Sequence, residues 1–199
     1  MTLDQMCQEA ARLSDRYDEF EKTENEDGRM VYEEDAGHYF NVFRDGMNEA
    51  YAEVARRYVK PDIYVQATVG EDGIVQLDEL DPMVYAVLNV FDETRDRQVQ
   101  FKFETKFQIK TNEEAGTVIT LFYQYVPDKM KGYSDEPIFP ESMVDPMIYI
   151  SLAVARMWLS EKKRELYHEW MNQYQTLLMQ CRKDLRHQSL RRIPRRTFR

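Results

Sequence analysis

The sequence predicts an α+β protein in which a helical scaffold carries an inserted small antiparallel β module and a basic C-terminal arm. Apolar residues recur every three or four positions before Pro61 and again after Pro146, whereas they alternate between Pro61 and Pro127. The final segment is rich in arginine and follows neither period. The expected parts are an N-terminal helical hairpin over 1–60, the β module over 61–127, a connector with two C-terminal helices over 128–188, and a basic, disordered arm over 189–199.

Composition bounds the class of protein. Of the 199 residues, 43% are hydrophobic and 13% aromatic, which is enough apolar mass for a core and excludes a wholly disordered chain. No stretch approaches 18 uninterrupted apolar residues, and the acidic first segment lacks a signal-like apolar run, so neither a membrane span nor a secretory signal is expected. Two cysteines, Cys7 and Cys181, support neither a disulfide framework nor a Cys-based zinc site, so buried thiols in a reducing compartment are expected.

The N-terminal part predicts two amphipathic helices. An apolar stripe at helical spacing covers residues 3–20, and a second covers residues 39–58. The polar segment 22–29 predicts a loop between them. Asp35 is the expected N-cap of the second helix, and Pro61 is expected to end it.

The β module rests on period-two alternation. Residues 63–69 alternate, reach the turn 70–73 and continue into 74–77, which predicts a β-hairpin. The other segments are a half-buried strand or strand pair over 99–109, a central strand over 117–125, and residues 83–91, for which strand and helix both stay open.

The C-terminal part returns to helical spacing. Prolines punctuate a connector between Pro127 and Pro146. Residues 147–159 are apolar on nearly all sides and predict a central buried helix, interrupted at Ser160 and Glu161. The long helix that follows has one apolar face, formed by Leu166, Trp170, Tyr174, Leu177, Cys181 and Leu185.

The residue pattern does not indicate a catalytic site. The sequence lacks G-x-S-x-G, P-loop and GxGxxG motifs, and its histidines have no second ligand at metal spacing. We therefore predict a non-enzyme with no metal, cofactor or catalytic residue. The groups considered and interpreted as solvated or packed side chains are His38, His168 and His187; Glu33, Glu34 and Asp35; Asp78, Glu79 and Asp81; Cys7 and Cys181; and Met157, Trp158 and Trp170.

Charge is distributed unevenly. The chain has 27 basic and 36 acidic residues, but residues 182–199 contain eight Lys/Arg and one acid, which leaves a net charge of −16 on residues 1–181. Arginine pairs well with carboxylate and phosphate, and the neighbouring apolar residues supply anchors. A solvated helix end, a nucleic-acid arm and an arm that docks on another protein are all compatible with this segment. The acidic body opposes approach to DNA and favours the protein partner.

Three short motifs resemble those of the head–tail adaptor (connector) proteins of tailed bacteriophages. They are Y-x-Y-V-P over Tyr123–Pro127, D-x-P-x-F-P over Asp135–Pro140, and the alanine-containing helix 147–159 followed by a long helix. The resemblance covers residues 121–185, and the first hundred residues match only in the order of their elements.

The resemblance implies a non-enzymatic virion structural protein that is assembled in the host cytoplasm and lies in the neck, with no membrane contact. Such adaptors form a ring, usually of twelve copies, under the portal vertex. The implied partners are other copies of the chain, the portal protein, a tail or further neck protein, and DNA that passes through the channel without sequence-specific binding. The residues expected to dock on the portal are Arg191, Arg192, Ile193, Arg195, Arg196, Phe198 and Arg199. The alternative is a nucleic-acid-binding phage accessory factor that uses the same Arg-rich segment.

Overall fold

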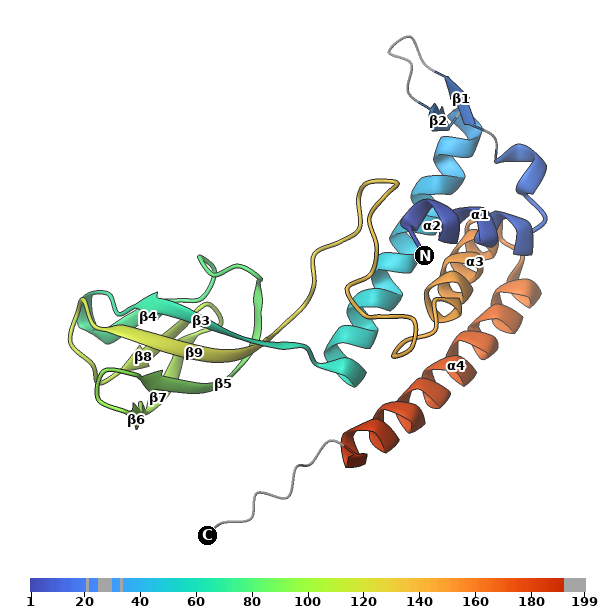
Figure 1. The fold of residues 1–199 in the computed structure, drawn as a ribbon. Helices are drawn as coiled ribbons and strands as arrows, with labels where there is room; N and C mark the ends of the chain where they lie inside the picture. The colour runs from blue at the N-terminus through green and yellow to red at the C-terminus, as the bar shows by residue number, and fades with distance from the viewer. Residues whose placement is uncertain (21, 25–29, 33, 192–199) are drawn as a thin grey trace. The chain divides into compact units, whose positions relative to one another are not determined.

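The computed structural model describes residues 1–20, 22–24, 30–32 and 34–191, and its fold is mixed α+β, as predicted (Figure 1). The chain divides into two compact units. The helical unit comprises Met1–Val54 and Lys129–Arg199, and the β unit comprises Ala55–Asp128. The helical unit is therefore built from two separate segments of the chain, with the β unit inserted between them. Among the described helices, none is both long and apolar enough to span a bilayer.

Helix α1, Leu3–Leu13, is shorter than the predicted stripe over 3–20. A capping box starts it: Gln5 N donates to Thr2 Oγ1 (3.2 Å) and Thr2 N donates to Gln5 Oε1 (2.9 Å). The Ser14 hydroxyl donates to Ala10 O (2.7 Å) at the other end, and Asp15 adopts a left-handed φ of 56°. A short 3₁₀ turn, Tyr17–Glu19, then brings Phe20 into the core, which is why its apolar spacing imitates a continuing helix.

Strands β1, Lys22–Glu24, and β2, Met30–Tyr32, pair antiparallel. The predicted loop over 22–29 is therefore wrong for residues 22–24, and residues 25–29 lie outside the described residues. Polar strand residues give no alternation signal, and this strand is fixed by an ion pair of 2.6 Å between Lys22 Nζ and Asp4 Oδ1.

Helix α2, Glu34–Val54, begins before Asp35, so this residue lies inside the helix and the predicted N-cap is wrong. The helix continues into a π-helical turn, Ala55–Val59, and the chain leaves it through Lys60 at a φ of 51°. The ending just before Pro61 agrees with the prediction, because the residue before a proline is disfavoured in the α conformation.

Helix α3, Met147–Ser160, is the buried centre of the helical unit, as predicted. Every residue from Ile148 to Ala155 is buried, and the helix packs against α1, α2 and α4 (Figure 1). Gly46 of α2 meets Ala153 of α3 so closely that a Cβ at position 46 would lie 2.7 Å from Ala153 Cα. Small residues at this crossing therefore set the distance between α2 and α3.

Helix α4, Arg164–Arg191, follows a short break at Glu161–Lys163, where Lys162 has a φ of 62°. Tyr174 and Cys181 of the predicted apolar face are buried, and the other four predicted residues are partly buried. Leu178 is buried although the prediction named its neighbour Leu177 instead. Because α4 runs to Arg191, the predicted start of the disordered arm at Ser189 is wrong by three residues. Residues 192–199 of the predicted arm lie outside the described residues.

The connector is tied to α2 by a buried amide. Asn48 Nδ2 donates to Met130 O (2.9 Å), and Met130 N donates to Asn48 Oδ1 (2.8 Å). Further along, Ile138 N donates to the Tyr51 hydroxyl (2.9 Å), and Phe139 packs edge-on against the Tyr51 ring. These contacts hold the chain against the helical unit where it returns from the β unit.

The β unit contains two antiparallel sheets around one core (Figure 1). The four-stranded sheet has the order β3-β9-β5-β6, with bounds Asp62–Thr68, Val118–Tyr125, Val84–Asp92 and Arg97–Gln98. The three-stranded sheet has the order β4-β8-β7, with bounds Ile74–Gln76, Gln108–Thr111 and Phe101–Thr105. The central position of β9 is confirmed, residues 83–91 are resolved as a strand, and residues 99–109 form a strand pair.

The predicted hairpin between residues 63–69 and 74–77 is wrong. Strand β3 pairs with β9, whereas β4 pairs with β8 in the other sheet. The intervening turn redirects the chain through left-handed conformations at Asp72 (φ 57°) and Gly73 (φ 76°). Only glycine fits at position 73, because a Cβ there would lie 2.4 Å from Thr111 O of β8.

The half-buried prediction for 99–109 holds only at its ends. Val99 and Ile109 are buried, but Phe103 and Phe107 are 56% and 44% exposed. Both phenylalanines lie near the turn of the β7–β8 hairpin, where the register shifts between Phe103 and Thr105. A bulge changes which face a strand residue occupies, so alternation in the sequence does not translate into alternating burial here.

Candidate functional site

The predicted partner-binding residues lie at the end of α4 and beyond it. Arg191 is the last residue of α4, and nothing is described of its side chain. The other predicted contacts lie outside the described residues; they are Arg192, Ile193, Arg195, Arg196, Phe198 and Arg199.

Packing along α4 determines where this basic segment begins. Tyr174 donates to Glu53 Oε2 of α2 (2.8 Å), and burial on α4 continues through Cys181. Directly after Cys181, the side chains of Arg182, Lys183 and Asp184 are exposed. The positively charged segment thus starts where the buried face of the helix ends, and its cations suit the negative end of the helix dipole.

The side chains considered for catalysis do not converge in the described part of the chain. Among those residues, no group of three or more His, Cys, Asp or Glu is placed to hold a metal ion. His38 and His168 are exposed, and nothing is described of the His187 side chain. Burial raises the pKa of the Cys7 thiol, as it does that of Cys181, so both thiols stay protonated and are poor nucleophiles.

The acidic residues, the methionine and the tryptophans that were considered as site residues lie in different parts of the chain. Asp78, Glu79 and Asp81 are exposed, in agreement with the prediction of solvated acids. Glu33 and the side chains of Glu34 and Asp35 lie outside the described part. Met157 and Trp158 are buried in the helical unit, and Trp170 is partly buried.

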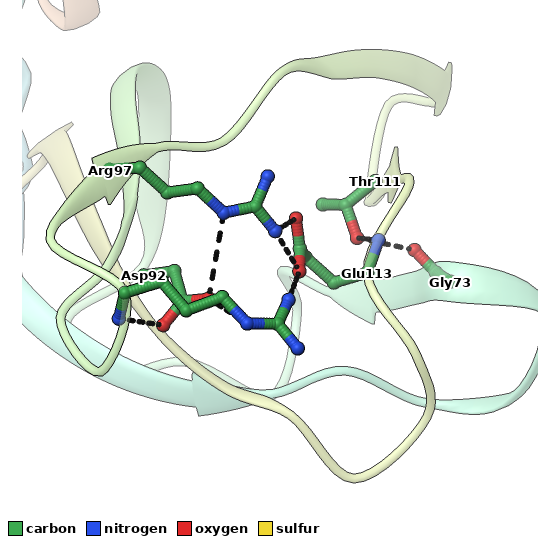
Figure 2. Close-up of polar contacts among 6 residues, drawn as sticks. Gly73, Asp92, Arg97, Thr111 and Glu113 are labelled. Atoms are coloured by element: carbon green, nitrogen blue, oxygen red, sulfur yellow. Dashed lines mark hydrogen bonds and ion pairs between the residues drawn. The ribbon is translucent and has the colours of Figure 1, made fainter.

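A cluster of two buried carboxylates and two half-exposed arginines in the β unit was not predicted. The Glu113 carboxylate, 3% exposed, accepts hydrogen bonds from Arg97 Nη2 (2.7 Å to each oxygen) and from Arg95 Nη1 (3.0 Å). Asp92 Oδ1 accepts from the backbone N of Arg95 (3.1 Å), and its Oδ2 lies 3.7 Å and 3.9 Å from Nε of Arg95 and Arg97. Figure 2 shows the guanidinium group of Arg97 turned toward the carboxylate of Glu113.

This arrangement is internally balanced. Two arginines face two carboxylates, so no excess positive charge is left at the cluster to attract an anion. The cluster links the β5–β6 turn to the segment between β8 and β9. Next to it, Glu113 N donates to Thr111 Oγ1, and the Thr111 hydroxyl donates to Gly73 O, both at 3.3 Å (Figure 2). We therefore assign the cluster a structural role.

Replacing Glu113 with glutamine should destabilise the β unit by about 1–2 kcal/mol, because a charge-assisted pair is weakened while both arginines remain half exposed to water. The measurement is amide hydrogen exchange of the β5, β8 and β9 backbone. The matched control is Glu114→Gln, since the adjacent Glu114 is exposed. Equal protection factors in the two variants would contradict the structural role.

The β unit contains an open groove. It has a volume of about 580 Å³, and it is formed between β3, the following turn and β4. Its lining combines the apolar residues Ala67, Ile74 and Leu80 with the acidic residues Glu71, Asp72 and Glu79. A second hollow of about 280 Å³ lies in the helical unit, and its lining includes three aromatic residues and the basic residues Arg44 and Lys131.

No protein-family model matches this sequence, and no curated protein matches it.

The residue pattern contains no direct signal for the carboxylate–arginine cluster or for the groove of the β unit. Asp92 and Glu113 are charged residues at strand ends, and such residues are usually solvated. The groove depends on which strands pair, and the wrong hairpin assignment concealed it. One available signal was charge, because residues 71–81 contain five acids and no basic residue.

Proposed function

We propose that this chain is a head–tail adaptor of a tailed bacteriophage. In this proposal it forms a ring of twelve copies under the portal vertex, in the neck of the virion. The ring joins the capsid to the tail, and the basic arm from Arg191 to Arg199 docks on the portal protein. The chain acts as a structural component and not as a catalyst.

The observation that carries this proposal is that each motif of the resemblance has a definite structural place. Tyr123 is fully buried in β9, its hydroxyl donates to Pro82 O (2.9 Å), and the motif ends where the chain leaves the β unit. Asp135 Oδ2 accepts from the backbone N of Lys131 (2.7 Å) and Gly132 (2.9 Å).

The second and third motifs complete the helical unit. The backbone oxygen of Asp135 accepts from Leu3 N (2.7 Å) at the start of α1, and the segment continues to Phe139 against Tyr51. The third motif is α3, the buried centre of this unit. These short motifs therefore lie at the end of the β unit and in the segment that completes the helical unit, which is the order along the chain that the adaptor family suggests.

Charge and symmetry support the same proposal. A net charge of −16 on residues 1–181 would repel the DNA backbone and let it slide through a channel. A single short basic arm makes a weak contact, but twelve arms on one ring raise the effective concentration of each next contact. A ring is thus a setting in which such an arm attaches firmly.

The test is binding of the purified protein to DNA-filled, tailless heads that carry a portal. We expect saturable binding near twelve copies per head, and no binding to heads assembled without the portal. Equal binding to both kinds of head would contradict the proposal. Tight, steeply salt-dependent binding to free duplex DNA at physiological salt would favour the nucleic-acid-binding alternative instead.

A further inference from the structure

We propose that strand β3, Asp62–Thr68, pairs antiparallel with β3 of a second copy of this chain, so that the free protein forms a two-fold dimer through its β unit. This inference goes beyond the proposed function, because a two-fold contact differs from the head-to-tail contact that closes a cyclic ring. The occupant of the β3 edge is therefore the same strand of another copy.

Strand β3 lies at the edge of the four-stranded sheet (Figure 1). Its ladder with β9 is flanked by hydrogen bonds from Tyr125 N to Pro61 O (3.0 Å) and from Val69 N to Thr117 O (2.9 Å). Backbone groups alternate in direction along an antiparallel strand, so the odd-numbered residues of β3 face β9 and the even-numbered residues direct N–H and C=O groups outward. In the described part of the chain, no strand pairs with this outer side. Such a row of donors and acceptors fits an extended strand.

The other edge strands of the β unit are short or irregular. Strand β6 has two residues and β4 has three, and the pairing of β7 with β8 contains a register shift. Strand β3 has seven residues, a continuous register with β9, and neither lysine nor proline. Exposed edges are commonly protected by lysine, proline, bulges or shortness, so the β3 edge is open to a pairing strand where the others are not.

Both faces of the sheet carry apolar surface up to this edge. Ile63, Val65 and Ala67 pack against the core of the β unit and are only partly buried. On the opposite face, Tyr64 is 64% exposed and stacks on Phe122 of β9, with ring centroids 4.4 Å apart. A strand added to the edge would continue both surfaces and remove more of these side chains from water.

The strand itself is the segment that matches this edge best. A two-fold axis at Val65 places Tyr64 opposite Gln66 of the second copy and Asp62 opposite Thr68, so every outward-directed residue of β3 gains a partner. The edge strands β4, β6 and β7 are too short or too irregular to do the same.

Charge favours the same antiparallel register. Lys60 precedes β3, and Glu71 and Asp72 follow it; all three side chains are exposed. The register brings Lys60 of each copy opposite Gly70 of the other, next to Glu71, so unlike charges meet at both ends of the paired strands. Within the strand, the charged residue Asp62 faces a threonine and not another acid.

The dimer has a consequence for assembly. A ring of purely cyclic symmetry contains no two-fold contact between neighbouring copies, so the dimer has to dissociate before its copies enter such a ring. The free protein is then kept from forming rings until a stronger contact competes for it. This consequence rests on the proposed function, whereas the β3 contact does not.

The experiment is sedimentation velocity of the full-length protein, with no portal present, over a range of micromolar concentrations. We expect a monomer–dimer equilibrium. Thr68→Asp sets an acid opposite Asp62 at two symmetry-related places and should raise the dissociation constant about tenfold. The matched control is Val118→Asp, because Val118 is the β9 partner of Thr68, is 50% exposed and lies away from the edge. This control should dimerise as the wild type does.

A charge exchange tests the register itself. Adding Asp62→Lys to Thr68→Asp replaces each repulsion by an opposite-charge pair and should restore dimerisation to at least the wild-type level. The inference is overturned if the wild type forms no dimer, if Thr68→Asp dimerises as tightly as the wild type or no more weakly than Val118→Asp, or if the exchange fails to restore the dimer. The samples contain no heads, so these outcomes leave the adaptor proposal to its own test.

Discussion

Replacing Gly46 with alanine should destabilise the helical unit by about 1–2 kcal/mol, the overpacking cost less the helix propensity gained. The new Cβ would lie 2.7 Å from Ala153 Cα and 3.2 Å from Ala153 N. Backbone atoms cannot rotate away as a side chain can, so α2 and α3 would have to separate along their buried contact. Overpacking of this kind costs more than the gain of about 1 kcal/mol that alanine offers over glycine in a helix.

The same helix supplies a matched control. Gly37 also lies in α2, but a Cβ there would meet nothing closer than Tyr32 O at 4.0 Å. Gly37→Ala should therefore stabilise the unit by up to about 1 kcal/mol. Both tryptophans, Trp158 and Trp170, belong to the helical unit, so urea unfolding followed by their fluorescence measures this unit alone. A Gly46→Ala variant as stable as Gly37→Ala would contradict the close packing of α2 on α3.

Reversing two charges of the arm, by Arg195→Glu and Arg196→Glu, should weaken attachment to portal-bearing heads about a hundredfold. Each lost pair is worth little by itself, but the loss is repeated in every copy of the ring. Deleting residues 192–199 should have at least the same effect and leave α4 whole, because the helix ends at Arg191. Raised salt should reproduce part of the loss in the wild-type protein.

The measurement is co-sedimentation with heads across a salt series. The control variant carries Arg182→Glu and Lys183→Glu, which make the same change of charge on an exposed part of α4. It should bind within a few-fold of the wild type. If the deletion variant binds as well as the full chain at every salt concentration, the arm is a solvated end.

Local patterns predicted the elements whose environment is set by their own residues. Alternation or continuous apolar character identified β9 and α3, since one is apolar on both faces and the other on nearly all sides. The proline at position 61 and the Ser160–Glu161 pair marked real ends of helices. Such signals depend only on residues that are close in the sequence, so they can be interpreted without knowledge of the rest of the fold.

The wrong secondary-structure predictions arose where a strand pairs with a segment that a local pattern in the sequence does not reveal. Residues 63–77 look like a hairpin, yet β3 and β4 find partners in β9 and β8, more than thirty residues away for each strand. The polar strand β1 is held by pairing with β2 and by the ion pair between Lys22 and Asp4. Neither interaction produces an alternating hydrophobic pattern in the sequence. The candidate groove inherits this difficulty, because its hollow exists only once β3 and β4 separate into two sheets.

The central claim is that this chain is a neck component, and electron microscopy of tailed particles that contain it tests this claim most directly. The reconstruction should be calculated around the tail axis without imposing the symmetry of the capsid. The account predicts twelve copies in a ring directly under the portal, with the end of each α4 directed at the portal. A particle in which this chain is absent from the neck, or attached to packaged DNA without ring symmetry, would contradict it.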